Sequence, residues 1–584
     1  MRAQFRTRIR VVLGLVVFAA LLIVARLYFV QIVRGEDYEQ KIDRQFTAAS
    51  GPFDRGAIYF ISKEGTFISA ATLASGFLVA VNPQTLTDPE GAFSALTAVA
   101  SSTVDRESFM AAARKKSQVY IEVAHRLSEA EGKTLAAKKI PGIQVLQERW
   151  RQYPGGALAA QTIGIVSYGS GDTLRGQTGL EATYDATLAR SGNSLFRNFF
   201  AELFSNVGNV LVDAKEAREG DIVTTIEPQI ETRLAEDLAK LSKRYSSKES
   251  GGIIMDPSTG AIIALATHPS YDANDRKNIS PSLLGNPLVE HVYEFGSIMK
   301  TLTMAAGLDA GVITPESTYN DTGCITVDQR TICNHDRKAR GVVPMQQVLS
   351  QSLNLGASWI ATELGQEKFR EYFTKLFGQK TGIDLPAETA ALLGNLSSPR
   401  QVEYDNMSFG QGIAVTPIQM IRAQAALANG GTMVEPHIAE RIQLDTGISR
   451  TLDWGGRVEI FKPKTAREVS VMLTSVADNS LGGGAHRIPT MTFAAKTGTA
   501  QLTDGKGGYH SDRYFHSFVG YFPSYAPRFI ILLYTNDPQG VQYASETLTN
   551  TFMDLTHFLI NYYAIPPDRG LVPQGGTPPD GARQ

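Results

Sequence analysis

The sequence predicts an α+β protein that is anchored in a membrane, with an extended N-terminal module followed by a larger domain built on an antiparallel sheet. An apolar run near the N-terminus, with Arg26 as its only charged residue, predicts the anchor. Strand patterns lie at both ends of the second half of the chain, around a helical middle, and predict one sheet whose last strands pair with its first. At 584 residues the chain is also too long for a single core.

The anchor is predicted at residues 11–33, after a cytoplasmic stub of residues 1–10 that is rich in arginine. About twenty apolar residues span a bilayer, and arginine before the span favours a cytoplasmic N-terminus. A cleaved signal peptide is the alternative, but the run is not followed by a clear small-x-small cleavage site. We therefore expect a single-pass protein of the plasma membrane, with all later residues outside the cytoplasm.

Residues 34–205 form the expected N-terminal module, which pairs no nucleophile with a base and is interpreted as a non-catalytic spacer. Residues 54–59 indicate a turn into a strand, residues 105–126 and 128–137 indicate helices, and residues 151–156 indicate another turn. The 56 basic and 58 acidic residues of the chain nearly balance, which argues against nucleic acid as a partner.

Residues 206–565 form the expected larger domain, and the Pro- and Gly-rich residues 566–584 are predicted to be a disordered tail. A helix is expected to begin at Pro228, where the fixed φ of proline suits a first helical position. Further helices are expected between Ser297 and Ala428. Strands are expected at residues 221–226, 251–255, 261–265, 490–495, 516–522 and 528–535.

Two cysteines suit an oxidising compartment. Cys324 and Cys333 are symmetric about Asp328-Gln329, so a two-residue hairpin turn there would place them opposite each other. At a non-hydrogen-bonded site the Cα atoms would approach to about 4.5 Å, which allows a disulfide. Two free thiols are the alternative. A zinc site is disfavoured because only His335 lies nearby, and we expect no metal.

The candidate nucleophile is Ser297, which follows a glycine and opens an apolar helical run, with Lys300 three residues later. Residues three apart share a helix face, so the two side chains can meet. The first-turn N–H groups of a helix have no intrahelical partner and can point at an anion. This pattern is typical of an activated serine nucleophile, although a lone Ser-x-x-Lys also occurs by chance.

Two further motifs follow in order. Ser352 and Asn354 offer a hydroxyl and an amide within one turn, although such residues also cap helices. Lys-Thr-Gly occurs at Lys380 and again at Lys496-Thr497-Gly498, which follows an expected strand. A strand edge offers backbone N–H groups, lysine can hold a carboxylate, and glycine permits close approach. We therefore select Lys496 and interpret Lys380 as structural.

In this order the three motifs resemble the signature of penicillin-binding proteins and serine β-lactamases. The surrounding sequence is similar to the monofunctional class B penicillin-binding proteins, the peptidoglycan transpeptidases of division and elongation. Residues 54–58, 151–154 and 176–185 resemble the N-terminal module of that class, which serves as a dimerisation or pedestal module. Residues 408–417 and 517–520 resemble segments of its catalytic domain. The resemblance implies an antiparallel sheet with helices on both sides and an all-helical subdomain.

The resemblance also implies roles. Ser297 would attack the penultimate D-alanine of a stem peptide with Lys300 as base, whose pKa burial and Lys496 would lower. Ser352 would pass a proton to the leaving D-alanine, and Asn354 would orient Lys300 and the substrate amide. The backbone N–H groups of Ser297 and Thr499 would form the oxyanion hole. The terminal carboxylate would bind the side chains of Lys496, Thr497 and Thr499.

The expected ligands are peptidoglycan stem peptides and β-lactams, and no cofactor is implied. The expected partners are a membrane glycan polymerase and other division or elongation proteins. A D,D-carboxypeptidase of the same fold stays open, because it differs only in using water as acceptor. A β-lactamase is disfavoured by the anchor and the spacer. A penicillin-binding sensor or inactive scaffold is disfavoured by the three intact motifs.

Overall fold

The structure is a computed structural model that describes residues 54–100, 104–168, 174–190, 219–444 and 447–569. These residues include no helix that is both long and apolar enough to cross a membrane, and the expected span at residues 11–33 lies outside them. Most of the expected tail and the expected boundary at residue 205 also lie outside them. The described residues divide into two compact units, each described here by itself.

The N-terminal unit comprises residues 73–151 with short pieces near residues 55 and 190. Its own core gathers apolar residues of its strands and helices around Phe109, which is fully buried. Its elements are the later part of β2 (Phe67–Val81), α3 (Pro89–Thr97), α4 (Arg106–Arg114), β3 (Ile121–Leu127), α5 (Glu129–Ala137) and β4 (Ile143–Gln152).

One helix prediction in this unit is half wrong. The helix expected at 105–126 ends at Arg114, and Ile121–Leu127 is a strand that pairs antiparallel with β2. β-Branched residues at alternate positions of this segment favour a strand over a helix. The helix expected at 128–137 is confirmed as α5, where Ser128 and Glu131 form a reciprocal capping box.

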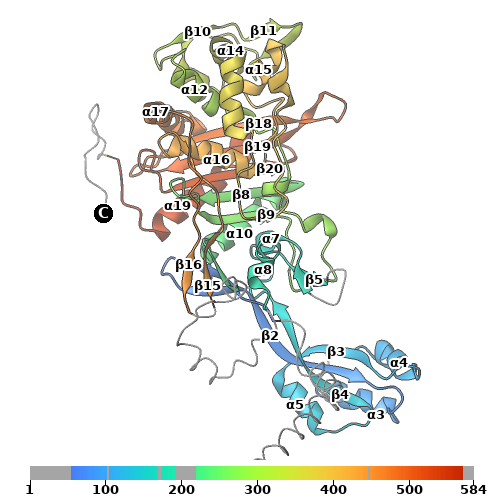
Figure 1. The fold of residues 1–584 in the computed structure, drawn as a ribbon. Coiled ribbons are helices and arrows are strands. Elements are labelled where there is room, and N and C mark those ends of the chain that lie inside the picture. The colour runs from blue at the N-terminus through green and yellow to red at the C-terminus, as the bar shows by residue number, and fades with distance from the viewer. Residues whose placement is uncertain (1–53, 101–103, 169–173, 191–218, 445–446, 570–584) are drawn as a thin grey trace, which may run out of the picture. The chain divides into compact units, whose positions relative to one another are not determined.

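The larger unit is built on a five-stranded antiparallel sheet in the order β18-β19-β20-β8-β9 (Figure 1). The expected pairing of the last strands with the 251–265 hairpin is confirmed, because β20 pairs with β8 from Ile530↔Met255 to Asn536↔Glu249. The strand expected at 221–226 forms as Gly220–Thr224 but lies in a different sheet. The strands are β8 (Glu249–Met255), β9 (Ile262–His268), β18 (Ala494–Thr503), β19 (Tyr509–Phe522) and β20 (Phe529–Asn536).

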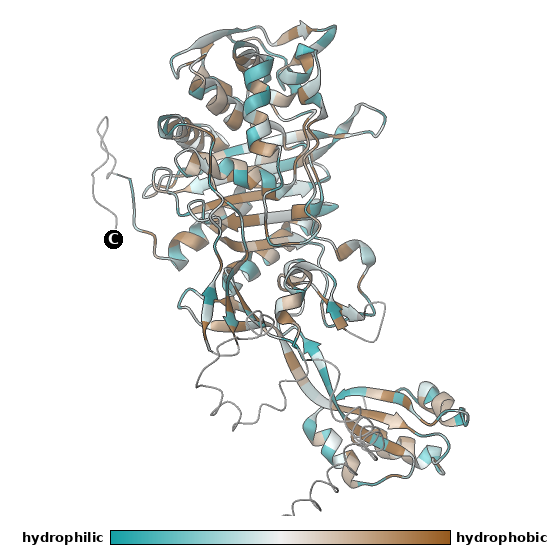
Figure 2. Cartoon of the chain, in the orientation of Figure 1, coloured by the Kyte–Doolittle hydropathy of each residue, from teal (hydrophilic) through white to brown (hydrophobic). Residues whose placement is uncertain are grey.

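Helices cover both faces of this sheet. Ile253 and Leu532 face a core shared with α16 (Pro417–Ala428). The neighbouring residues Ile254 and Leu533 face a second core shared with α10 (Pro228–Tyr245) and α19 (Thr549–Tyr562). Successive strand residues point to opposite faces, so a sheet buried on both sides reads as a continuous apolar run. Figure 2 shows this hydrophobic character along the central strands.

A helical region follows β9 and differs from the expected all-helical subdomain, because it also contains two small antiparallel sheets. Its helical elements are η4 (Gly296–Ile298), α12 (Met299–Asp309), α13 (Met345–Ser350), α14 (Asn354–Phe377), η5 (Gly394–Ser397), α15 (Gln401–Ser408) and α16. Its strands are β10 (Thr318–Asp321), β11 (Cys324–Val327), β12 (Arg330–Cys333) and β13 (Gly341–Pro344).

The cysteine hairpin has the expected register, with Cys324 opposite Cys333 and Ile325 opposite Ile332. Both turn residues have positive φ, 47° at Asp328 and 63° at Gln329, as the commonest two-residue hairpin turn requires. A disulfide joins the two cysteines, whose Cα atoms lie 4.1 Å apart.

The remaining elements of the larger unit complete the domain around these parts. The first strands and helices are β1 (Ile58–Ile61), α6 (Ala160–Ile163), β5 (Val166–Tyr168), β6 (Leu174–Gly176), α7 (Gly179–Thr183), α8 (Asp185–Leu188), β7 (Gly220–Thr224), η3 (Pro281–Leu283) and α11 (Pro287–Glu290). The later ones are β14 (Thr432–Met433), β15 (Ala439–Leu444), β16 (Ser449–Thr451), β17 (Val458–Glu459), α17 (Pro463–Asn479), η6 (Leu481–Gly484) and α18 (Ala544–Thr547).

Candidate active site

Ser297 lies in the short turn η4 that leads directly into α12, where its side chain is half-buried. The glycine before it is required by the local geometry. Gly296 has φ of 61°, and a Cβ there would lie 2.7 Å from the carbonyl oxygen of Thr499. Its small size therefore lets the start of the helix lie directly against β18.

Lys300 is 1% exposed. Its Nζ donates to the backbone oxygen of Ser352 at 2.6 Å, to Ser352 Oγ at 3.2 Å and to Asn354 Oδ1 at 2.7 Å. The direct contact expected between Ser297 and Lys300 is not among the hydrogen bonds of the described residues. Instead, the structure brings Lys300 together with the Ser352-x-Asn354 motif.

Ser352 lies in the turn between α13 and α14 and has φ of 53°, a left-handed conformation that non-glycine residues seldom adopt. Its Oγ accepts hydrogen bonds from both lysines, since Lys496 Nζ also lies at 3.2 Å. A hydroxyl has two acceptor lone pairs and one proton. With both lone pairs engaged, the Ser352 proton is the part of this group that can be donated.

The second Lys-Thr-Gly lies inside β18, not after a strand as expected, because β18 begins at Ala494. Lys496 is 3% exposed and donates to the backbone oxygen of Thr497 at 2.9 Å. Gly498 is needed for the packing of β18 against η4. A Cβ there would lie 2.4 Å from both the Phe295 oxygen and Ser517 Oγ.

The first Lys-Thr-Gly lies in the loop after α14 and is not brought to Ser297. Lys380 is exposed. The backbone N–H groups of Thr381 and Gly382 donate to the carboxylate of Glu388, at 2.6 and 3.2 Å. The carboxylate of Glu388 therefore holds the backbone of this loop in place.

The two buried lysines have lowered pKa values. Burial, and secondly the charge of Lys496, holds the pKa of Lys300 well below its usual range. Burial also lowers the pKa of Lys496 to about 8. Removal from water disfavours the charged form of an amine, and a second cation adds to this effect. Lys300 is therefore suited to act as a base, while Lys496 is closer to its charged form at neutral pH.

An open pocket of about 630 Å³ adjoins this group of side chains. Ser352, Lys496 and Thr497 line it, together with Arg340, residues of η6 (Leu481–Gly484) and Glu546 of α18 (Ala544–Thr547). The pocket offers space for an extended ligand beside β18. The described residues contain no cluster of acidic, histidine or cysteine side chains that could hold a metal ion.

Two contacts of this site could not be found from the motifs. Ser517 Oγ donates to the Phe295 oxygen at 2.8 Å and so ties β19 to the turn that carries Ser297. The carbonyl oxygen of Cys333 accepts from Asn354 Nδ2 at 2.9 Å and fixes the orientation of that amide. Neither residue shows this role by its type or spacing, because the contacts arise only when distant segments pack together.

Comparison with known families gives two matches in tandem. Residues 53–195 match the penicillin-binding protein dimerisation domain, and residues 251–556, more than half of the chain, match the penicillin binding protein transpeptidase domain. The chain is a class B penicillin-binding protein. It is therefore an enzyme of the peptidoglycan D,D-transpeptidase family, whose members are acyltransferases of the serine type.

Relatives of this penicillin-binding protein share about a quarter of its sequence. Stage V sporulation protein D of Bacillus subtilis is 27% identical over 536 residues, which cover 90% of this chain and 81% of the relative. The probable peptidoglycan D,D-transpeptidase PbpC of Pseudomonas aeruginosa is 27% identical over 454 residues, 77% of each chain.

Solved structures share the fold of this penicillin-binding protein. Penicillin binding protein 3 of Mycobacterium tuberculosis, complexed with aztreonam, superposes with a TM-score of 0.66 at 22% identity, over 90% of this chain and 100% of the other. Penicillin Binding Protein 2X of Streptococcus thermophilus gives a TM-score of 0.70 at 19% identity, over 90% and 82% of the two chains. At these identities the likeness concerns the fold alone.

Proposed function

We propose that this class B penicillin-binding protein cross-links peptidoglycan stem peptides through an acyl-enzyme on Ser297, and that β-lactams acylate the same serine. The observation that carries the proposal is the convergence of Lys300 and Lys496 on Ser352 Oγ, beside the helix that Ser297 opens. Acyl transfer requires a nucleophile, a base, a proton donor for the leaving group and a site for the oxyanion, and each has a candidate here.

Lys300 is the proposed base. As a neutral amine it has two N–H donors and one lone pair. In this form the two donors serve Asn354 Oδ1 and the Ser352 backbone oxygen, at 2.7 and 2.6 Å, and the lone pair is left for the proton of Ser297. The third donation, to Ser352 Oγ at 3.2 Å, belongs to the protonated amine, which can pass its proton to that hydroxyl. Lys300 takes that proton as Ser297 Oγ bonds to the carbonyl carbon of the penultimate D-alanine.

Ser352 is the proposed proton carrier to the leaving group. When the C–N bond of the substrate breaks, the Ser352 hydroxyl protonates the nitrogen of the leaving D-alanine and regains a proton from Lys300. An amine of a neighbouring stem peptide then attacks the ester, loses its proton along the reverse path and releases Ser297. The product is a new amide bond between two peptides, and one D-alanine is freed.

The oxyanion hole is assigned to the backbone N–H groups of Ser297 and Thr499, each worth about 3 kcal/mol. Gly296 and Gly498 support this assignment, because their lack of a Cβ lets η4 and β18 approach closely. Lys496, Thr497 and Thr499 are proposed to hold the substrate carboxylate. Thr499 Oγ1 accepts from the Ala544 N–H at 3.0 Å, so its own proton is available to that carboxylate.

The proposed setting is the outer face of the plasma membrane, with residues 11–33 as a single span and the N-terminus in the cytoplasm. The arginine-rich start of the chain supports this orientation. A membrane glycan polymerase is the proposed partner, together with other proteins of division or elongation. One relative is named a probable peptidoglycan D,D-transpeptidase FtsI in Caulobacter vibrioides.

Labelling with a fluorescent penicillin tests the proposal. The wild type is expected to form a stable adduct that maps to Ser297, and Ser297→Ala is expected to form none. The chain also supplies a matched pair of lysines. Lys496→Ala should lose labelling by tenfold or more, whereas Lys380→Ala, in the other Lys-Thr-Gly, should label as the wild type does.

Three results would contradict the proposal. Labelling that persists in Ser297→Ala would place the nucleophile elsewhere. Prompt turnover of a chromogenic β-lactam would indicate a β-lactamase. Release of D-alanine from a pentapeptide without any cross-linked product, even with excess acceptor amine, would indicate a carboxypeptidase.

A further inference from the structure

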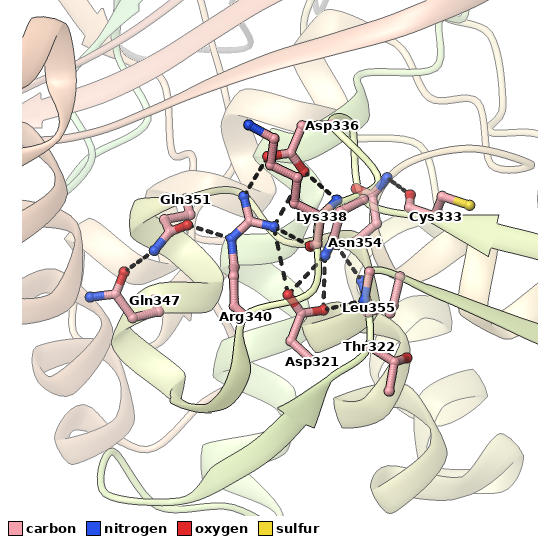
Figure 3. Close-up of polar contacts among 12 residues, drawn as sticks. Asp321, Thr322, Cys333, Asp336, Lys338, Arg340, Gln347, Gln351, Asn354 and Leu355 are labelled. Carbon is pink, nitrogen blue, oxygen red and sulfur yellow. Dashed lines mark hydrogen bonds and ion pairs between the residues drawn. The ribbon is translucent and has the colours of Figure 1, made fainter.

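The turn that carries Ser352 and Asn354 is held at both ends by one segment, residues 321–340 (Figure 3). Before Ser352, the Gln351 Oε1 accepts from Arg340 Nε at 2.5 Å. After Asn354, the Leu355 N–H donates to Asn334 Oδ1 at 3.2 Å. This arrangement places two positioning contacts on the residues that directly flank the motif.

Asp321 is the centre of this network, and its side chain is completely buried. Its carboxylate accepts from Asn334 Nδ2 at 2.8 and 3.1 Å and from the Gly323 N–H at 3.3 Å, and it lies 3.6 Å from Arg340 Nη1. A buried carboxylate is costly unless it is paired and hydrogen-bonded. Asp321 therefore fixes the side chains of both Asn334 and Arg340.

Arg340 has few alternative orientations. Its guanidinium donates to the two oxygens of Asp336 at 3.2 and 2.9 Å and to the Lys338 backbone oxygen at 2.7 Å. Its own backbone N–H donates to the backbone oxygen of Asp321 at 3.0 Å. A guanidinium with a planar fork of donors is well suited to fix several acceptors at once. The Gln351 amide is thus held against a rigid group.

We propose that Arg340, Asp321 and Asn334 are positioning residues for acylation, which hold Ser352 and Asn354 where their oxygens meet Lys300. The left-handed φ of 53° at Ser352 shows why such support is needed. A non-glycine residue in this conformation persists only where its surroundings fix it. Without the flanking contacts the turn relaxes, and Lys300 loses the oxygens that orient it. The inference rests on the proposed function.

The test measures acylation by a fluorescent penicillin over a range of concentrations. Each variant yields the labelled fraction, the rate constant at saturation and the half-saturating concentration. Arg340→Ala is expected to lower the rate constant by tenfold or more. It should leave the half-saturating concentration within twofold, because Lys496 and β18 are intact. The matched control is Arg513→Ala, which removes an arginine that binds both oxygens of Asp537, at distances from 2.6 to 3.1 Å.

Gln351→Ala leaves the ion pair of Asp321 and Arg340 intact. Because Gln351 is exposed, this variant can replace Arg340→Ala if that variant folds poorly. It should lower the same rate constant by about threefold. The double variant should act no more strongly than Arg340→Ala alone, because residues that act through one contact are not additive.

Each outcome separates this inference from the proposed function. A wild-type rate constant in the labelled fraction of both variants would overturn the positioning role and leave Ser297 as the nucleophile. A raised half-saturating concentration with an unchanged rate constant would also overturn it, since Arg340 would then contact the ligand itself. A wild type that forms no adduct at Ser297 would instead refute the proposed function.

Discussion

At the scale of single residues, the site depends on two lysines that share one hydroxyl. Lys300 and Lys496 both donate to Ser352 Oγ, and burial lowers the pKa of each. Their proposed roles require opposite protonation states. Lys300 must be neutral to accept a proton, whereas Lys496 must be charged to hold a carboxylate.

The pH dependence of acylation follows from this difference. At low pH Lys300 becomes protonated and the rate falls. At high pH Lys496, whose pKa burial lowers to about 8, loses its charge and the rate falls again. We expect a bell-shaped profile of the second-order rate constant for a penicillin, with its basic limb near pH 8, measured from pH 5 to 10. A rate that still rises at pH 10 would contradict the role of Lys496. Lys380→Ala is the control and should leave the profile unchanged.

A second residue-scale prediction concerns Gly498. A methyl group there would meet the Phe295 oxygen and Ser517 Oγ at 2.4 Å, so Gly498→Ala must move β18 away from η4. We expect penicillin acylation to slow by tenfold or more. Gly394→Ala is the control, because a Cβ at Gly394 meets no atom within 4 Å. Equal rates in the two variants would show that the close approach of β18 is not needed.

The identities of these residues could be predicted from the sequence, but their contacts could not. Spacing alone suggested that Ser297 and Lys300 meet. The contacts of Lys300 with Ser352 and Asn354 carry no such local signal, because those oxygens lie within its reach only after α14 has packed against α12. Likewise, the link from Ser517 to Phe295 spans 222 positions of the chain and leaves no local pattern.

At the scale of elements, the cysteine hairpin joins stability to the site. The Cys333 oxygen accepts from Asn354 Nδ2, so the position of β12 bears on the amide that orients Lys300. A disulfide that closes a loop of this size stabilises by about 2–3 kcal/mol in the chain-entropy view. The disulfide joins the first residue of β11 to the last residue of β12, at the end of the hairpin away from the turn.

Replacing both cysteines tests this link. The double variant Cys324→Ser, Cys333→Ser is expected to lower the Tm and to slow acylation several-fold, since β12 is held less firmly. The unreduced wild type should contain no free thiol in a thiol-titration assay. Two free thiols, or a double variant with wild-type Tm and rate, would contradict the prediction.

The elements differ in how well the sequence predicts them. The hairpin of β8 and β9 and the helix from Pro228 were predicted correctly, because turn residues and a proline mark their ends. β3 falls within an expected helix because its segment follows α4 closely along the chain, and the alternation that favours a strand rests on only two β-branched residues, Ile121 and Val123. β18 was placed too early because Met491 and Phe493 are apolar and buried but precede the sheet.

At the scale of the whole molecule, the chain divides into two units with separate cores. The fold class and the pairing of the last strands with the 251–265 hairpin followed from the order of the elements. The return of residues 56–72 and 152–189 to the larger unit could not be predicted, because local sequence does not report which core a strand or turn joins. All the proposed site residues belong to the larger unit, and Phe109 belongs to the core of the N-terminal unit.

Truncating one buried phenylalanine in each unit tests whether the two cores are energetically separate. Phe109→Ala should destabilise the N-terminal unit by about 3–5 kcal/mol, seen as faster hydrogen exchange in β3 and α4, while penicillin acylation stays within twofold of wild type. The matched variant is Phe369→Ala, in the helix that begins at Asn354, where Phe369 is fully buried against Phe373. It should lower both the labelled fraction and the acylation rate. If Phe109→Ala slows acylation as much as Phe369→Ala does, the stability of the N-terminal unit controls the site.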